Sequence, residues 1–300
     1  MPATGSTREG RWLVVGAAVL WSTSGFFAKA PWFAEWPLAM RGLLLAFWRA
    51  LFATLVLLPM VRRPTWTWRL LPMLVAFVLM NVTYLGAMTR TTAANAIWLQ
   101  STAPLWVFLV GVTLFKEPAH RLDFVRLAFG GLGIALILAF ELPGSEWTGT
   151  LLGLAAGITY AGIVLSLRAL RDVDTGFLVM INHLATAVVL FPVAWTSGDW
   201  PRGIQWPALA MFGMLQMGIP YLLFAQGVRR IAGHEASGIA LLEPILVPLW
   251  VFLAWHHHPS YDPPRWWTLL GGALILTGLS IRYFADVTRN RPVGPADHDR

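Results

Sequence analysis

The chain has 300 residues, of which 57% are hydrophobic and only 12% are charged. A soluble domain carries about 25% charged residues, so this composition excludes an ordinary soluble protein. The net charge is +7, but the basic side chains flank apolar segments instead of forming a patch with interleaved aromatic residues, which excludes nucleic acid as the expected partner. The absence of cysteine excludes disulfides, thiolate metal ligands and a catalytic thiol.

Ten apolar segments follow one another along the chain, with short gaps that leave no room for a soluble domain. A helix needs about 20 apolar residues to cross a hydrocarbon core of about 30 Å, and each segment is close to that length. The sequence therefore predicts an all-α integral membrane protein with ten transmembrane helices. The segments are Trp12–Ala28, Leu38–Met60, Leu70–Met88, Ala93–Phe115, Leu122–Phe140, Thr148–Leu167, Phe177–Trp195, Trp206–Val228, Ala236–Trp255 and Trp266–Phe284.

The basic residues predict the orientation of these helices. Most Lys and Arg residues flank the segment ends that lie on the same side as the N-terminus, and few flank the other ends. Loops rich in Lys and Arg stay in the cytoplasm, so we expect both termini there, in a multi-pass protein of the cell (inner) membrane.

The two halves of the chain repeat a common pattern. The hexapeptide PLWVFL occurs in the fourth and in the ninth segment. Aligning Pro104 with Pro244 also aligns Gly131 with Gly271 at equal spacing. Such agreement over a long distance indicates a duplicated unit.

The duplication predicts two five-helix repeats, residues 1–145 and residues 146–300. Because each repeat has an odd number of crossings, the second enters the membrane from the opposite side, so the two are inverted. Inverted repeats are typical of secondary transporters, which bind substrate near the bilayer midplane between the repeats.

Four sequence stretches are distinctive: VLWSTSGFFAK in the first segment, STAPLWVFLVGVTLFKEP and RLAFGGLGIALIL in the fourth and fifth, and YLLFAQGVRRIAGHEASGIALLEPILVPLWVFLAW in the eighth and ninth. These stretches resemble EamA-type proteins of the drug/metabolite transporter superfamily. The resemblance covers essentially the whole chain and implies export of small metabolites such as amino acids. One departure is that His256-His257-His258 stands where the first half has Lys116-Glu117-Pro118, so the acidic residue usual near that turn is missing.

Arg49 is the first candidate site residue, because it lies near the middle of the second segment. An arginine at the bilayer centre costs roughly 2.5–3.5 kcal/mol, so it must face the protein interior or a water-filled cavity. Its planar guanidinium suits a carboxylate or a phosphate. Arg49 therefore predicts a contact with an anionic substrate group or a gating ion pair, and the alternative is hydrogen bonding to backbone carbonyls of neighbouring helices.

Glu243 is the candidate coupling residue, about 10 Å deep in the ninth segment at helical rise. A carboxyl group at that depth either pairs with a cation or stays protonated. This predicts proton coupling or cation binding. The alternative is that Glu243 and Pro244 form a helix-breaking structural element.

Further polar and aromatic residues inside the segments complete the predicted substrate-binding site. In the repeat alignment Tyr84 corresponds to Tyr221, and one of Asn182 and His183 corresponds to Arg49. Aromatic faces with a few amides suit a small amphipathic solute or an organic cation. The same polar groups serve equally well as hydrogen-bonding contacts between helices. The predicted substrate-binding residues are Arg49, Asn182, His183, Tyr84, Tyr221, Trp98, Gln100 and Trp21.

No sequence motif indicates a cofactor or a reaction. The chain has no HExxH, no Walker A loop and no GxGxxG after a strand, and three consecutive histidines on a helix point about 100° apart, so we expect no metal and no cofactor. No paired carboxylates or nucleophile–base set supports an intramembrane enzyme. The sequence therefore favours a secondary transporter acting as an exporter, with a small-molecule substrate and the lipid bilayer as partners. A lipid flippase, a non-transporting scaffold and a homodimer stay open.

Overall fold

The computed structural model describes residues 6–289, with side chains described for all of these except His234 and residues 282–289. The chain ends that we expect in the cytoplasm, residues 1–5 and 290–300, lie outside the described residues. Within the described part all regular structure is helical and no strand occurs.

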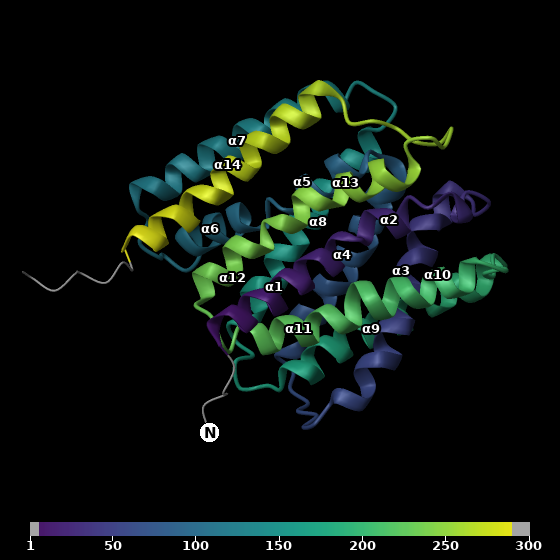
Figure 1. Ribbon diagram of the computed structural model, residues 1–300, viewed down its shortest axis with the longest axis horizontal. Helices are drawn as coiled ribbons and strands as arrows, with labels where there is room; N and C mark the ends of the chain where they lie inside the picture. Colours follow the sequence, from purple (N-terminus) through teal and green to yellow (C-terminus); the bar gives the residue numbers. More distant parts are fainter. Residues whose placement is uncertain (1–5, 290–300) are drawn as a thin grey trace, which may run out of the picture.

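The helices run back and forth as a bundle (Figure 1). Short 3₁₀ turns lie at Pro31–Phe33 and Leu58–Met60, and a π-helical turn lies at Met214–Gly218. In chain order the α-helices are α1 (Thr7–Ser22), α2 (Ser24–Ala28), α3 (Leu38–Leu57), α4 (Leu70–Arg90), α5 (Ala93–Gln100), α6 (Ala103–Thr113), α7 (Arg121–Glu141), α8 (Trp147–Leu167), α9 (Thr175–Ser197), α10 (Gln205–Gly213), α11 (Ile219–Gly227), α12 (Gly233–Ala240), α13 (Leu242–Trp255) and α14 (Trp266–Arg289).

Nine helical segments of the described chain are long and apolar enough to cross a membrane. They coincide with the first nine predicted segments, with ends that differ by a few residues. The tenth predicted segment, Trp266–Phe284, corresponds to α14, whose apolar part Trp266–Ile281 is a shorter helix. Hydropathy therefore located every long helix, because only uninterrupted apolar stretches of this length can lie in the hydrocarbon core.

Three of these segments are each interrupted by one or two residues between two helices. Thr23 separates α1 from α2, residues 101–102 separate α5 from α6, and Leu241 separates α12 from α13. Pro104 lies in the first turn of α6, and Pro244 lies in the first turn of α13 directly after Glu243. Proline is tolerated in a first turn because the missing N–H would have no helical acceptor there. Irregular backbone at membrane depth occurs where it lines a cavity or is buried in protein, so these breaks point to the site.

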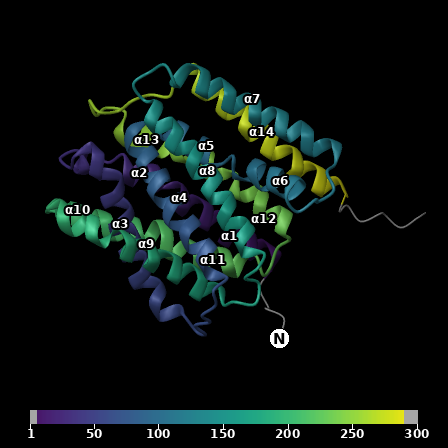
Figure 2. The same cartoon turned by 180° about the vertical axis from the view of Figure 1, so that it is seen from behind.

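Helices of the first half of the chain pack in pairs against helices of the second half. Helix α4 packs along α8, α1 packs along α11, α3 packs along α9, and α7 packs along α14. Figures 1 and 2 show α7 and α14 side by side at one edge of the bundle, from both directions. Close approach of α10 to α3 depends on Gly213, because a Cβ there would lie 2.6 Å from the carbonyl oxygen of Arg49. This contact brings the π-helical turn after α10 next to the Arg49 side chain.

Candidate functional site

Arg49 is fully buried, at 0% exposure, and its guanidinium is held by neutral groups from two other segments. Its Nη2 donates to Oδ1 of Asn81 on α4, and its Nη1 donates to Oε1 of Gln216 in the π-helical turn at 3.4 Å. The guanidinium carbon lies 5.1 Å from the ring centroid of Phe212, a cation–π contact. The Nε atom has no hydrogen-bond partner. The positive charge is therefore oriented but not neutralised.

The two amides that hold Arg49 are themselves fixed by backbone carbonyls. Nδ2 of Asn81 donates to the carbonyl oxygen of Phe77 at 2.9 Å, and Nε2 of Gln216 donates to the carbonyl oxygen of Trp21 at 3.1 Å. Because their N–H groups are engaged there, their oxygens are left to face the guanidinium. This orientation favours a cation between them and supplies no negative charge.

Aromatic rings surround this polar centre. The ring of Trp21 meets that of Tyr221 edge-on at 5.3 Å, and His183 lies 4.9 Å from Phe77 and 6.4 Å from Tyr221 between ring centroids. His183 is fully buried, and neither of its ring nitrogens has a hydrogen-bond partner. The hydroxyl of Tyr84 shares a buried hydrogen bond of 2.8 Å with Ser24 Oγ. His183 thus packs here as an aromatic ring with two unused polar atoms.

Glu243 lies in the first turn of α13, directly after the break in the ninth span, and is half-buried. A carboxylate is favoured at a helix N-terminus, where the free N–H groups carry partial positive charge. Glu243 interacts electrostatically with Arg49, yet no ion pair between these two described side chains is formed. A buried cation and a half-buried carboxyl group therefore influence each other electrostatically without forming an ion pair.

The remaining predicted residues occupy less central positions. The indole Nε1 of Trp98 donates to the carbonyl oxygen of Pro244 at 2.9 Å and so links the break of the fourth span to that of the ninth. Nε2 of Gln100 lies 3.3 Å from Sδ of Met80. Asn182 is buried, and its Oδ1 has no partner. The structure thus gathers Arg49, Trp21, Tyr221 and His183 closely, and the binding roles of all the predicted site residues stay predictions.

The sequence analysis did not single out three residues that the structure places at this site. Asn81 holds Arg49, and Ser24 holds Tyr84. Tyr160 of α8 is 42% exposed and interacts electrostatically with Tyr221 and Glu243. Asn81 had a detectable signal, since an amide three residues before Tyr84 lies on the same helix face. Tyr160 had none, because one tyrosine in an apolar helix has many structural explanations.

The triple histidine lies at the end of α13, away from this site. His256 stacks on Phe252 with ring centroids 4.8 Å apart, and Nδ1 of His258 lies 2.7 Å from Oγ of Ser260. In the part of the chain that the structure describes, no group of three or more His, Cys, Asp or Glu is placed to hold a metal ion.

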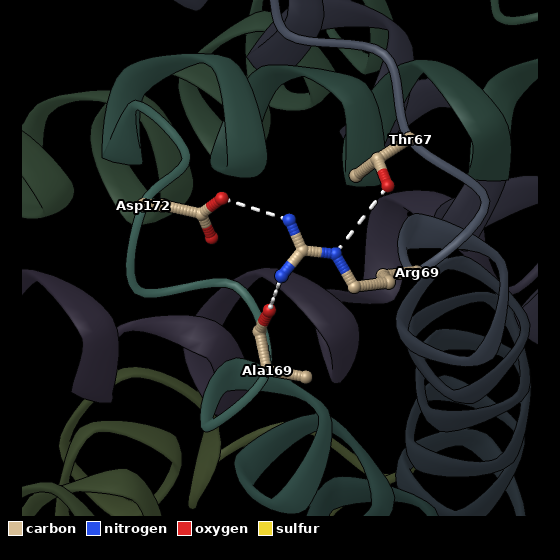
Figure 3. Close-up of polar contacts among 4 residues, drawn as sticks. All are labelled: Thr67, Arg69, Ala169 and Asp172. Atoms are coloured by element: carbon tan, nitrogen blue, oxygen red, sulfur yellow. Dashed lines mark hydrogen bonds and ion pairs between the residues drawn. The ribbon is translucent and has the colours of Figure 1, made fainter.

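Ion pairs connect residues 1–145 with residues 146–300 at the helix ends that we predict to face the cytoplasm. Arg69, just before α4, donates to Asp172 Oδ2 at 2.7 Å and to the carbonyl oxygen of Ala169 at 2.8 Å (Figure 3). The hydrogen bond from Arg69 lowers the pKa of Asp172. Among the described side chains the pairs of this kind are Arg69–Asp172, Arg168–Glu117, Arg11–Glu235 and Arg230–Glu9.

A polar cluster occupies the opposite ends of these helices. Nζ of Lys29 donates to the carbonyl oxygen of Thr91 at 2.6 Å, and Oγ1 of Thr91 lies 2.8 Å from Oε2 of Glu146. Partial burial and then the neighbouring Asp262 raise the pKa of Glu146 to about 7. Burial lowers the pKa of Lys29 to about 8. Glu141, next to this cluster, accepts hydrogen bonds from the side chains of Asn95 and Trp267.

Long apolar helices, three of them interrupted, together with a fully buried arginine held by neutral groups, define a multi-pass membrane protein with a polar interior. The chain belongs to the EamA-like transporter family, whose model matches residues 8–139 and again residues 147–284. This confirms the resemblance seen in the sequence. The protein is therefore a membrane transporter, and a small-molecule substrate and the surrounding lipid are its expected partners.

Two curated relatives are also described as transporters. An uncharacterized transporter of Archaeoglobus fulgidus is 27% identical over 282 residues, which cover 92% of this chain and 97% of that protein. The uncharacterized transporter YojE of Bacillus subtilis is 22% identical over 184 residues, covering 58% of this chain and 57% of that one. A solved structure described only as the crystal structure of a protein has a TM-score of 0.64 at 18% identity and covers 96% of this chain and 100% of its own, which shows the fold alone.

Proposed function

We propose that this protein is a secondary transporter that exports small organic metabolites such as amino acids by alternating access. The observation that carries the proposal is the separation of Arg49 and Glu243, which interact across the interior without pairing. An amino acid carries a carboxylate and an ammonium group, and these two side chains offer one partner for each. The neutral oxygens around Arg49 keep its guanidinium oriented without competing for it as a carboxylate would.

The proposal includes two inverted five-helix repeats, residues 1–145 and 146–300, that cross the membrane ten times. Two observations support it. The family model matches once in each half. Packing of α1 along α11 repeats the packing of α4 along α8, as a pseudo-two-fold axis between the repeats requires. The site then lies between the repeats, with Arg49 on the first and Glu243 on the second, in an inner membrane with both termini in the cytoplasm.

Each site residue has a proposed role. Arg49 binds the substrate carboxylate, and Glu243 binds the ammonium group or the coupling proton. Trp21, Tyr221 and Tyr160 line the interior on the side of Glu243. Asn81 and Gln216 position Arg49 without contacting substrate.

Reconstituted flux tests the proposal. Purified protein in liposomes is assayed with a panel of labelled amino acids for counterflow exchange and for accumulation under an imposed pH gradient. The charge-removing substitution Glu243→Gln should permit exchange but abolish gradient-driven accumulation. Glu35→Gln, at an exposed glutamate outside the spans, serves as the matched control and should leave both activities unchanged.

Different outcomes point elsewhere. Accumulation by Glu243→Gln at the wild-type rate removes the coupling role and leaves Glu243 with Pro244 as an element that ends a helix. If no amino acid of the panel is transported but a labelled lipid moves between the leaflets, the protein is a flippase. No flux of either kind indicates a scaffold.

A further inference from the structure

A groove on the lateral surface of the bundle is not part of the site described above. It lies between α3, α4 and α8 and has a volume of about 550 Å³, within the ~300–1,000 Å³ range of small-ligand pockets. It lies near the ends of these helices that we predict to be outermost. Its apolar walls include Ala39, Leu43, Gly86, Leu151, Leu152 and Ala155.

Small side chains create this groove. A Cβ on Gly42 would lie 2.9 Å from the Cα atom of Gly86, so the backbones of α3 and α4 are in direct contact there. The side chain of Leu152 packs over Gly86 from α8. The small side chains of Ala39 and Ala155 line the same groove, and the space between the three helices stays unfilled by the protein. An apolar space that opens toward lipid suits a hydrocarbon chain.

Positive charge gathers at the mouth of the groove. Arg90 lines it and donates through Nη2 to the carbonyl oxygen of Ala39 at 3.1 Å. Arg41 lies near enough to Arg90 for the two guanidinium groups to repel each other. Both bond to backbone carbonyls, and neither forms one of the ion pairs between described side chains. Two arginines of like charge therefore lie close together here.

The first turn of α8 adds to this positive environment. Trp147 and Thr148 line the groove, and the N-terminus of α8 has no side-chain cap. The carboxyl group of Glu146, the residue before Trp147, accepts a hydrogen bond from the hydroxyl of Thr91, and it forms no ion pair with Arg90 among the described side chains. Trp147 is 49% exposed, as expected of an indole at the level of lipid headgroups.

We infer that this groove binds one acyl chain of an anionic phospholipid whose phosphate is held by Arg90 and Arg41. The apolar walls exclude a polar solute from the groove itself, and the paired arginines select a negatively charged headgroup over a neutral one. The groove joins α3 and α4 of residues 1–145 to α8 of residues 146–300, so the bound lipid contacts both proposed repeats. This site is independent of Arg49 and Glu243.

The test measures lipid binding to the purified, delipidated full-length protein in detergent by native mass spectrometry. Phosphatidylglycerol is titrated, with diacylglycerol of the same chains and inorganic phosphate as separate ligands. Arg90→Gln should weaken phosphatidylglycerol binding about fivefold, as expected for one arginine near an anionic headgroup. Ala155→Phe fills the groove while keeping both charges and should weaken binding at least as much. Arg202→Gln, at an exposed arginine outside the groove, is the matched control.

The three ligands and two groove variants show whether the arginines, the groove or both account for phospholipid binding. Selective phosphatidylglycerol binding that both groove variants weaken supports the inference. Diacylglycerol binding equal to that of phosphatidylglycerol overturns the role of the arginines. Equal binding of inorganic phosphate overturns the role of the groove. If Arg90→Gln fails to fold, Ala155→Phe alone still decides, because unchanged binding by this variant rejects the site.

Discussion

Replacing Arg49 with alanine separates a binding role from a structural one. The substitution removes hydrogen bonds to Asn81 and Gln216 and the contact with Phe212. It also removes a central charge that costs roughly 2.5–3.5 kcal/mol in the membrane. Each hydrogen bond to a charged group contributes about 1.5–3 kcal/mol, so losing two of them exceeds the gain from removing the charge by at most about 3–4 kcal/mol, and the free energy of unfolding should fall by no more than that. A substrate carboxylate that loses the same kind of bond should bind about 10- to 150-fold more weakly.

The assay compares stability and transport on the same preparations. Thermal unfolding of purified variants reports folding, and concentration-dependent counterflow in liposomes reports substrate affinity. Arg49→Lys keeps the charge but lacks the planar pair of donors, so it should restore little transport. Arg62→Ala, at an exposed arginine after α3, is the control. If Arg49→Ala inserts normally and transports at the original rate, Arg49 is a packing residue and the binding hypothesis is wrong.

Three further predictions concern the two ends of the molecule. A single cysteine introduced at Glu35 should react with an impermeant thiol reagent added outside cells, whereas one introduced at Arg63 should not. The reverse labelling pattern would contradict the predicted orientation of the helices in the membrane. The pKa of Glu146 is raised to about 7 in the folded protein, so the folded state binds more protons than the unfolded one. The stabilisation from this group is therefore complete at acidic pH and is lost as the pH rises through 7. The Glu146→Gln variant should flatten the pH dependence of the unfolding temperature. If the variant and the wild type have the same pH profile, this assignment is wrong. The exposed Arg69–Asp172 pair should contribute only about 0.2–1 kcal/mol to stability. If this ion pair restrains opening toward the cytoplasm, replacing either residue with alanine should alter the transport rate, and the charge-swapped double variant should restore that rate. Unchanged transport rates in the alanine variants would show that the pair is only a surface contact.

Hydropathy alone located the helices because the bilayer imposes one length on every crossing. The same logic marked Arg49 as buried, since a central charge in lipid has to face protein. The sequence also indicated a helix-breaking element at Glu243 and Pro244 as one alternative, and the structure interrupts the helix at Leu241, two residues before Glu243. Orientation and the inverted repeats rest on basic flanks and internal similarity, and they stay predictions.

The partners of these residues could not be read from the sequence. Arg49 is held by Asn81, 32 residues away, and by Gln216, 167 residues away, and these contacts depend on how each helix is rotated about its axis. Apolar helices carry little pattern that specifies rotation, because lipid-facing and buried positions are both hydrophobic. The role of Trp98 as a donor to Pro244 and the groove beside Gly86 follow from the same packing. The sequence by itself determined which segments lie in the membrane and that Arg49 is inside. Only the tertiary structure decided which side chains meet there, because close contact between helices depends on small residues that face each other at the same level of neighbouring helices.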